Sequence, residues 1–254
     1  MNSDRLSKKE EWAEEWAQSD VMLEFDPNAV FFRDIHNLCQ RHLPYDKNMK
    51  CLEVGCYPGT YMWYFNKFFG YQASGIEYVE ECIAPCKKFM GSLGIDAEII
   101  YGDFFEYSPE KLWDVVVSFG FIEHFKDTQA VIQQHLDMIQ PGGYLVLVIP
   151  NHAGLNGTIL KFLDQEKYKI HNLMSYKDMA SGLKDTKQAE ILEGGYYGHI
   201  GFWNAALYPK IANWPRIPHF VTQKSLAVVE RAGAYIVPNT RYLSPNSALI
   251  ARKL

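Results

Sequence analysis

The stretch Lys50-Cys51-Leu52-Glu53-Val54-Gly55-Cys56-Tyr57-Pro58-Gly59-Thr60 decides the fold. Its first half is typical of the end of a short buried strand, and the following residues, Thr60 to Phe69, are typical of a helix. Gly55 and Gly59 allow unusual φ values and let the backbone approach a bound molecule where a Cβ would collide. Such a strand-to-helix turn binds ligands in doubly wound α/β folds. Glu53 argues against a pyrophosphate ligand, because its carboxylate would repel the phosphates that a helix N-terminus attracts.

The segment Glu53-Val54-Gly55-Cys56-Tyr57-Pro58-Gly59 matches E/D-x-G-x-x-x-G. In this the chain resembles the class I S-adenosylmethionine (SAM) methyltransferases of the small-molecule branch. The resemblance implies that Glu53 orders the loop or meets the aminopropyl end of SAM, and that the backbone of Gly55, Cys56, Tyr57 and Gly59 packs against its methionine part. A glycine-rich turn in another α/β protein is the alternative. A Rossmann-like NAD oxidoreductase should show G-x-G-x-x-G, which this turn lacks.

Later strand ends supply further candidate cofactor residues. Glu77 ends a predicted strand, Ala73 to Glu77, about 20 residues beyond the turn, where an acid can accept both ribose hydroxyls. Tyr78 follows it. The alternative for Glu77 is an ordinary exposed acid.

Asp103 and Phe104 follow a predicted third strand, Asp96 to Tyr101. The resemblance implies that Asp103 accepts a hydrogen bond from the adenine amino group, with the Phe104 backbone at the ring edge. A turn cap is the alternative for Asp103. The predicted fourth strand, Trp113 to Gly120, adds its last residues to the cofactor site: Ser118, Phe119 and Gly120.

The alternation of strands and helices predicts a doubly wound, Rossmann-like α/β fold with a seven-stranded, mostly parallel sheet and an antiparallel last strand. The resemblance implies the strand order 3-2-1-4-5-7-6. Pro141-Gly142-Gly143 precedes a predicted fifth strand, Tyr144 to Pro150, and is a further family mark. The last predicted elements are a helix from Thr222 to Ala232 that Gly233 ends, a strand at 234–242 and a strand at 246–253.

Three parts follow from this pattern. Residues 1–44 are predicted to form N-terminal helices and a lid or packing arm. Residues 45–151 and 222–254 are predicted to form the SAM-binding domain. Residues 152–221 interrupt the alternation and are predicted to form a cap over the carboxyl ends of the strands, where the acceptor would bind; a structural or dimer-forming insertion is the alternative.

Methyl transfer from SAM to a hydroxyl requires in-line positioning and removal of a proton, without a covalent enzyme nucleophile. The candidate bases are three histidines near the predicted carboxyl edge: His124, His152 and His199. His124 lies in Phe121-Ile122-Glu123-His124-Phe125, which resembles the family's V/I/L-E-H segment. His199 follows a glycine-rich, aromatic stretch, and His152 follows the fifth strand. A packed or solvated histidine is the alternative for each.

No metal site is predicted. Some ubiquinone-pathway O-methyltransferases, which this region resembles, bind a divalent metal through E-x-x-E-H, but Gly120 stands where the first acid would be. Cys82 and Cys86 alone supply too few ligands for zinc.

Composition limits the remaining classes of protein. A 254-residue chain with 48% hydrophobic and 22% charged residues is ordinary for a globular protein, and its net charge of -5 disfavours a dedicated nucleic-acid binder. Five cysteines without a C-x-x-C pair and a charged, apolar-poor N-terminus predict reduced thiols and a cytoplasmic location. No apolar run is long enough for a membrane span. The sequence leaves open whether the chain forms a homodimer.

The combined expectation is a SAM-dependent methyltransferase that releases S-adenosylhomocysteine. Its predicted acceptor is a small polar molecule, and a phosphorylated or nucleotide-linked acceptor is compatible with the sequence. The predicted reaction is O-methylation of a sugar or nucleotide-linked sugar. N-methylation of an amino sugar, O-methylation of a quinone or lipid precursor, and SAM binding without catalysis are the alternatives.

Overall fold

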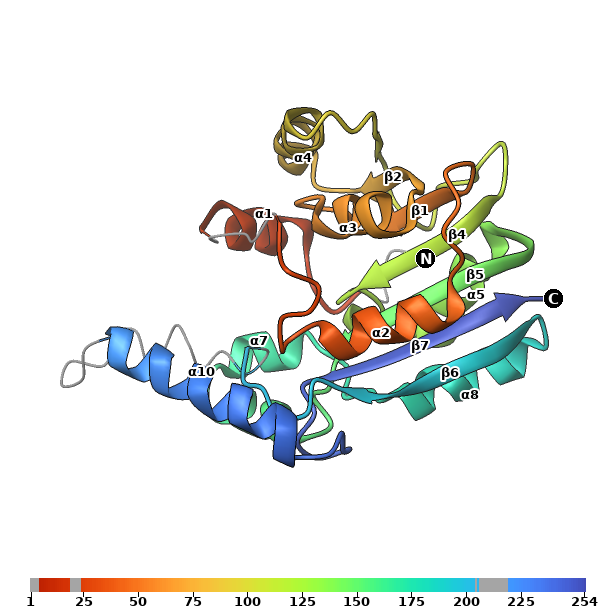
Figure 1. Cartoon of the computed structure of the whole chain (residues 1–254). Coiled ribbons are helices and arrows are strands. Elements are labelled where there is room, and N and C mark those ends of the chain that lie inside the picture. The colour runs from red at the N-terminus through yellow and green to blue at the C-terminus, as the bar shows by residue number, and fades with distance from the viewer. Residues whose placement is uncertain (1–4, 19–23, 204, 206–218) are drawn as a thin grey trace.

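A twisted sheet of seven strands, in the order β3-β2-β1-β4-β5-β7-β6, organises the part of the chain that the computed structural model describes: residues 5–18, 24–203, 205 and 219–254 (Figure 1). The strands are β1 (Lys50–Val54), β2 (Gln72–Glu77), β3 (Glu98–Tyr101), β4 (Trp113–Phe119), β5 (Ile139–Pro150), β6 (Ala189–Tyr197) and β7 (Asn246–Lys253). Strands β1 to β5 pair in parallel, and β7 pairs antiparallel with both β5 and β6. The predicted fold class and strand order are confirmed.

Helices cover both faces of the sheet. The bounds are α1 (Lys9–Gln18), α2 (Arg33–His42), α3 (Thr60–Phe69), α4 (Glu80–Ser92), a 3₁₀ turn η1 (Ile122–His124), α5 (Thr128–Asp137), α6 (Leu155–Leu163), α7 (Gln165–Lys169), α8 (Tyr176–Thr186) and α10 (His219–Ile236). One apolar core joins α2, α3 and α4 to the sheet face that carries Val115 and Val117, and the other joins α5 and α8 to the face that carries Val116. Alternate residues of β4 thus enter opposite cores, as expected of a strand covered on both faces.

The sixth strand is not where the sequence predicted it. Residues 234–236 end α10, and residues 237–242 form no strand; β6 comes instead from 189–197, inside the range predicted as the cap. A Cβ at Gly194 would lie 3.1 Å from a methyl carbon of Leu249 on β7. Glycine at this position therefore permits a close approach between the two strands.

Gly233 lies inside α10 and does not end the helix. A Cβ on Gly233 would lie 2.1 Å from the side chain of Ile200, so glycine here lets the two segments pack. Pro85 lies inside α4, beyond the first turn in which a helix usually tolerates proline. Asp127 caps α5 as its residue type suggests, with Oδ1 accepting from the Ala130 amide at 3.0 Å.

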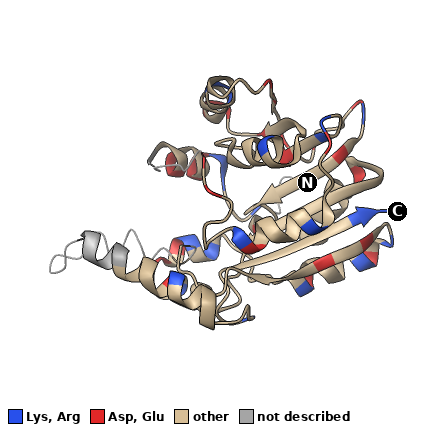
Figure 2. Ribbon diagram, viewed as in Figure 1, with Lys and Arg blue, Asp and Glu red and all other residues tan. Residues whose placement is uncertain are grey.

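The range 152–221 holds α6, α7, α8 and β6, whereas residues 204 and 206–218, with Tyr208 and Trp214 of the predicted aromatic cap, lie outside the described residues. Acidic and basic residues occur together on α8 (Figure 2). Among the described residues, no helix has the length and apolarity that crossing a bilayer requires.

Candidate active site

The turn after β1 has the geometry that its sequence predicts. Gly55 and Gly59 have φ angles of 71° and 104°, in the left-handed region that favours glycine. The Glu53 carboxylate reaches past the turn and accepts a hydrogen bond from the Met62 amide at 2.9 Å, near the N-terminus of α3. This hydrogen bond joins Glu53, near the end of β1, to the first turn of α3.

Glu77 lies at the end of β2 and is 6% exposed. Its two carboxylate oxygens accept hydrogen bonds from the amides of Val79 at 2.9 Å and Tyr57 at 3.4 Å. Burial raises the pKa of Glu77, and these amide hydrogen bonds oppose the shift. The acid is thereby held rigidly beside the glycine-rich turn.

Both acids line a cavity of about 540 Å³, within the usual range of small-molecule sites. Seven of the predicted cofactor residues line it: Glu53, Gly55, Tyr57, Glu77, Tyr78, Phe119 and Gly120. Five others do not: Cys56, Gly59, Asp103, Phe104 and Ser118. Gly59 instead precedes α3 as its N-cap residue, and the Cys56 and Ser118 side chains are buried in the fold.

Asp103 is engaged by an arginine from the N-terminal segment. Arg5 contacts its carboxylate at 2.5 Å, and the Arg5 guanidinium carbon lies 4.6 Å from the ring centre of Tyr78. Phe104 lines a small neighbouring cavity together with Arg5. The guanidinium thus lies beside the residues expected to meet adenine.

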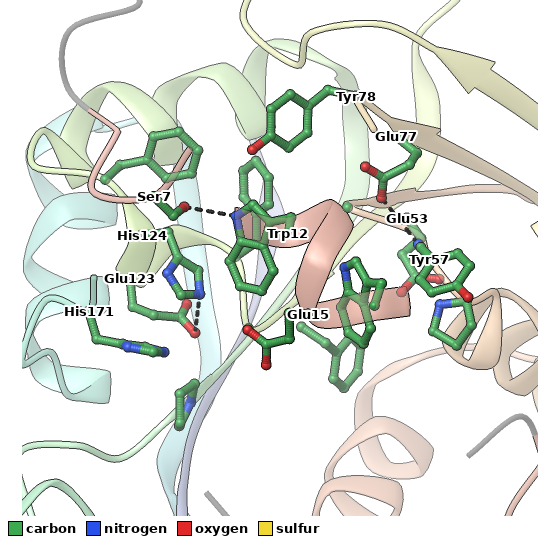
Figure 3. A pocket seen from close by; sticks show the side chains of 18 of the residues that line it. Ser7, Trp12, Glu15, Glu53, Tyr57, Glu77, Tyr78, Glu123, His124 and His171 are labelled. Atoms are coloured by element: carbon green, nitrogen blue, oxygen red, sulfur yellow. Dashed lines mark hydrogen bonds and ion pairs between the residues drawn. The ribbon is translucent and has the colours of Figure 1, made fainter. Parts of the chain in front are cut away.

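Helix α1 contributes Trp12, Glu15 and Trp16 to the cavity wall (Figure 3). Trp16 packs edge-on against Tyr57 with ring centres 5.2 Å apart, and Trp12 packs against His124 at 4.8 Å. The Glu15 carboxylate and the Lys167 ammonium, which lies on α7, form a 2.5 Å ion pair. Trp12 and Trp16 are spaced i,i+4 and so share one face of this helix, but no sequence signal identified Arg5, Glu15 or Lys167 as lining residues.

A cluster of Glu123, His124 and His171 forms another part of the cavity wall (Figure 3). One side-chain donor atom from each residue lies within 4.8 Å of the other two. The Nε2 atom of His124 is 3.7 Å from Oε1 of Glu123, and the rings of His124 and His171 have centres 4.5 Å apart. No local sequence pattern indicates His171, because its approach to His124 is a tertiary contact over 47 positions.

Backbone contacts fix the orientation of both histidines. His124 Nδ1 lies 2.8 Å from the carbonyl oxygen of Ile170, and His171 Nδ1 lies 2.6 Å from that of Lys167. A carbonyl oxygen can only accept, so each Nδ1 carries the hydrogen and each Nε2 keeps a lone pair. The backbone amide of Asn172 also donates a hydrogen bond to the Glu123 carbonyl oxygen at 2.7 Å. This bond joins the loop after α7 to η1.

Burial makes this cluster electrically neutral in the absence of a bound ion. It raises the pKa of Glu123 to about 8 and lowers the pKa of His124 to about 3. The pKa of His171 falls to about 4 for the same reason. Glu123 and His124 are therefore adjacent but are not an ion pair, and their 3.7 Å separation is too long for a hydrogen bond.

The other two predicted bases have different surroundings. His152 is buried with its ring centre 4.6 Å from that of His171, so it lies behind the cluster and does not line the cavity. His199 is outside the lining as well: its Nδ1 is 2.7 Å from the Val237 carbonyl and its Nε2 is 3.2 Å from Asp34. The structure thus brings His124 and His152 together with His171 and leaves His199 elsewhere.

A second cavity, of about 490 Å³, adjoins the first and shares four lining residues with it: Tyr61, Phe119, Gly120 and Pro150. Aromatic rings of Phe31, Phe32 and Trp203 form much of its other wall, and Glu230 is its one lining acid among the described residues. The two cavities together offer room for a cofactor and a second molecule.

This sheet order, the acid-glycine turn and the acid at the end of β2 define a class I SAM-dependent methyltransferase. Residues 26–236 match the family described as "Methyltransferase domain", and the chain belongs to that family.

Solved structures share the fold. The N-methyltransferase NodS from Bradyrhizobium japonicum, in complex with S-adenosyl-L-homocysteine, is 14% identical over 97% of this chain and 99% of its own, with a TM-score of 0.59. A SAM-dependent methyltransferase from Archaeoglobus fulgidus is 18% identical over 87% and 94%, with a TM-score of 0.56. Geranyl diphosphate C-methyltransferase from Streptomyces coelicolor is 12% identical over 88% and 78%, with a TM-score of 0.60. Neighbours that methylate nitrogen and carbon share this fold, so the fold does not identify the acceptor.

Proposed function

We propose that this methyltransferase uses SAM to methylate a hydroxyl oxygen of a small acceptor at the cluster of Glu123, His124 and His171. The observation that carries the proposal is that this buried polar cluster lines the same cavity as seven of the predicted cofactor residues. SAM, when bound, supplies an electrophilic methyl group.

The residues around the turn fit that cofactor. The Glu77 carboxylate is held at the cavity wall by two amides and can accept from ribose hydroxyls. Gly55 leaves the backbone open beside the ligand, and a Cβ there would approach Phe121 to 3.1 Å. The Trp16 ring on Tyr57 closes this side of the cavity and would exclude water from it.

His124 supports O-methylation because its Nε2 lone pair is free of the Ile170 contact and the residue lines the cavity. In the proposal this atom accepts a hydrogen bond from the acceptor hydroxyl, orients its oxygen, and takes the hydroxyl proton as the methyl group is transferred. The side chains of His171 and Glu123 lie next to His124 and form the surroundings of its Nε2 atom. His152 acts behind them as a positioning residue, and His199 has no part at this cluster.

The acceptor stays a prediction: a sugar or nucleotide-linked sugar, with a quinone or lipid precursor as the alternative. The cytoplasmic location and a homodimer also stay predictions. The aromatic second cavity suits the body of an acceptor, since ring faces stack on sugars and on apolar rings alike.

N-methylation of an amine is the second candidate function. Phe31, Trp203 and Glu230 around the second cavity favour it, because aromatic faces with a carboxylate attract ammonium groups. An amine also needs less help from a base than a hydroxyl does.

A methyl-transfer assay with SAM over a panel of hydroxyl and amine acceptors, read by product mass spectrometry, tests the proposal. We expect O-methylated product, reduced by about 10²- to 10⁴-fold in His124→Asn, the range of general acid–base contributions. His199→Asn should retain turnover. Product from amines alone, with full activity in His124→Asn, would favour the second candidate and contradict the first.

A further inference from the structure

We propose that Glu123, His124 and His171 bind one divalent first-row transition-metal ion, such as zinc or iron, at the wall of the cavity. Two imidazole nitrogens and one carboxylate oxygen form a ligand set for such ions that leaves positions open for another molecule. All three donor atoms lie within 4.8 Å of one another. Side-chain movements of about 1 Å would bring them to bonding distances of about 2.1 Å from one ion.

The orientation of the histidines is that of metal ligands. Each donates Nδ1–H to a backbone carbonyl, from Ile170 for His124 and from Lys167 for His171, and so leaves Nε2 as the coordinating atom. Carbonyl partners of this kind commonly fix the tautomer and ring orientation of metal-bound histidine. The Asn172 amide holds the same loop to the Glu123 carbonyl at 2.7 Å. The ligand set is therefore built by the fold across η1 and the loop after α7.

The carboxylate of Glu123 is an independent indication of a ligand. The residue is 1% exposed, and its Oε2 atom is buried without a hydrogen-bond partner. Such a group is costly unless something compensates it. Both basic side chains of the cavity lining have other partners, Arg5 with Asp103 and Lys167 with Glu15. A bound cation would compensate this carboxylate, and a proton on Glu123 is the competing explanation.

A metal ion at this cluster differs from the prediction of no metal site. That prediction noted Gly120 where the first acid of E-x-x-E-H would stand, and it did not include His171 as a ligand. Nitrogen ligands favour zinc, iron, cobalt or manganese over magnesium and calcium, which prefer oxygen. The role of the ion rests on the proposed methylation of a hydroxyl. A metal ion on Nε2 would occupy the lone pair of His124, so in the metal-bound protein the ion would take over the part of His124: it would face the cavity, bind the acceptor oxygen and make that hydroxyl more acidic. The binding itself does not depend on that function.

The test is a titration of the chelator-treated full-length protein with Co²⁺, followed by visible absorption, and with Zn²⁺, followed by calorimetry, without SAM or acceptor. We expect one ion per chain, displacement of Co²⁺ by Zn²⁺, and no displacement by excess Mg²⁺. His171→Ala should weaken binding by at least about 10- to 100-fold. His42→Asn, a histidine on α2 that pairs with Glu193, is the matched control and should bind like the unchanged protein.

Two further measurements separate ligand loss from misfolding. Circular dichroism should show folded His171→Ala, and His171→Cys should restore Co²⁺ binding with a new sulfur-to-cobalt absorption band. The absence of stoichiometric binding to the unchanged protein, or equal affinity in His171→Ala, would overturn the inference. Methyl transfer by protein proven free of metal would overturn the role of the ion and leave the proposed function standing. Metal binding without any methyl transfer would overturn the proposed function and leave the metal site standing.

Discussion

At the scale of single residues, Glu53 combines burial with a place in the cavity wall. It is 3% exposed, and burial raises its pKa well above the ordinary value of 4.5, with Cys86 and Glu77 adding to the shift and the Met62 amide opposing it. A raised pKa means that the folded state binds a proton more tightly than the unfolded state. The stability that this preference gives is present below about pH 4.5 and is lost as the pH rises through the folded-state pKa.

Glu53→Gln is therefore expected to stabilise the protein in the absence of cofactor. The amide oxygen can still accept from Met62, while the cost of a buried charge is removed. The melting temperature should rise by about 2–4 °C for each kcal/mol gained. The difference from the unchanged protein should be greatest near pH 8 and vanish below about pH 4.5, which thermal unfolding over this range would measure. A loss of stability at pH 8 would contradict this account of Glu53.

At the scale of elements, α1 forms part of the cavity wall, and its Trp16 packs on Tyr57. We expect Trp16→Ala to release bound S-adenosylhomocysteine about 10-fold faster, a change of about 1.4 kcal/mol, because the ring would no longer cover the ligand. Stopped-flow displacement would measure the release rate. Lys9→Ala on the same helix, whose exposed ammonium contacts Tyr101, is the control. Equal release rates in the two variants would contradict a covering role for α1.

Elements whose pattern is local were predictable from the sequence. The apolar run of β4 and the glycine turn after β1 follow from residue type and spacing alone. In contrast, β6 is an edge strand with Gly194 and Gly195, and α10 contains Gly233; each glycine permits a close approach to a distant residue, Leu249 for Gly194 and Ile200 for Gly233. Local patterns cannot distinguish these glycines from loop signals, because their reason lies in tertiary packing.

At the scale of the whole molecule, the predicted site was found in part. Residues on parallel strand ends, Glu53 and Glu77, meet because the topology brings the carboxyl ends of neighbouring strands together. Arg5 and His171 enter the site from segments without a strand-end position, so no spacing rule could place them. The ion pair of Arg5 with Asp103 likewise depends on how the N-terminal segment folds back over the sheet.

Ligand binding should stabilise the whole fold, because a ligand that binds only the folded state shifts the unfolding equilibrium. S-adenosylhomocysteine at 100 times its Kd should add about 2.7 kcal/mol, which corresponds to a rise of about 5–10 °C in melting temperature for a domain of this size. NAD should give no rise, since the turn lacks a pyrophosphate-binding glycine pattern. Glu77→Gln should lose most of the rise at the same ligand concentration, whereas Glu80→Gln, an exposed acid three residues further on, should keep it. Differential scanning fluorimetry of the three proteins measures these shifts. NAD and SAM would both bind at the carboxyl ends of these strands. Stabilisation by NAD and not by S-adenosylhomocysteine would therefore contradict the assignment of the cavity to SAM.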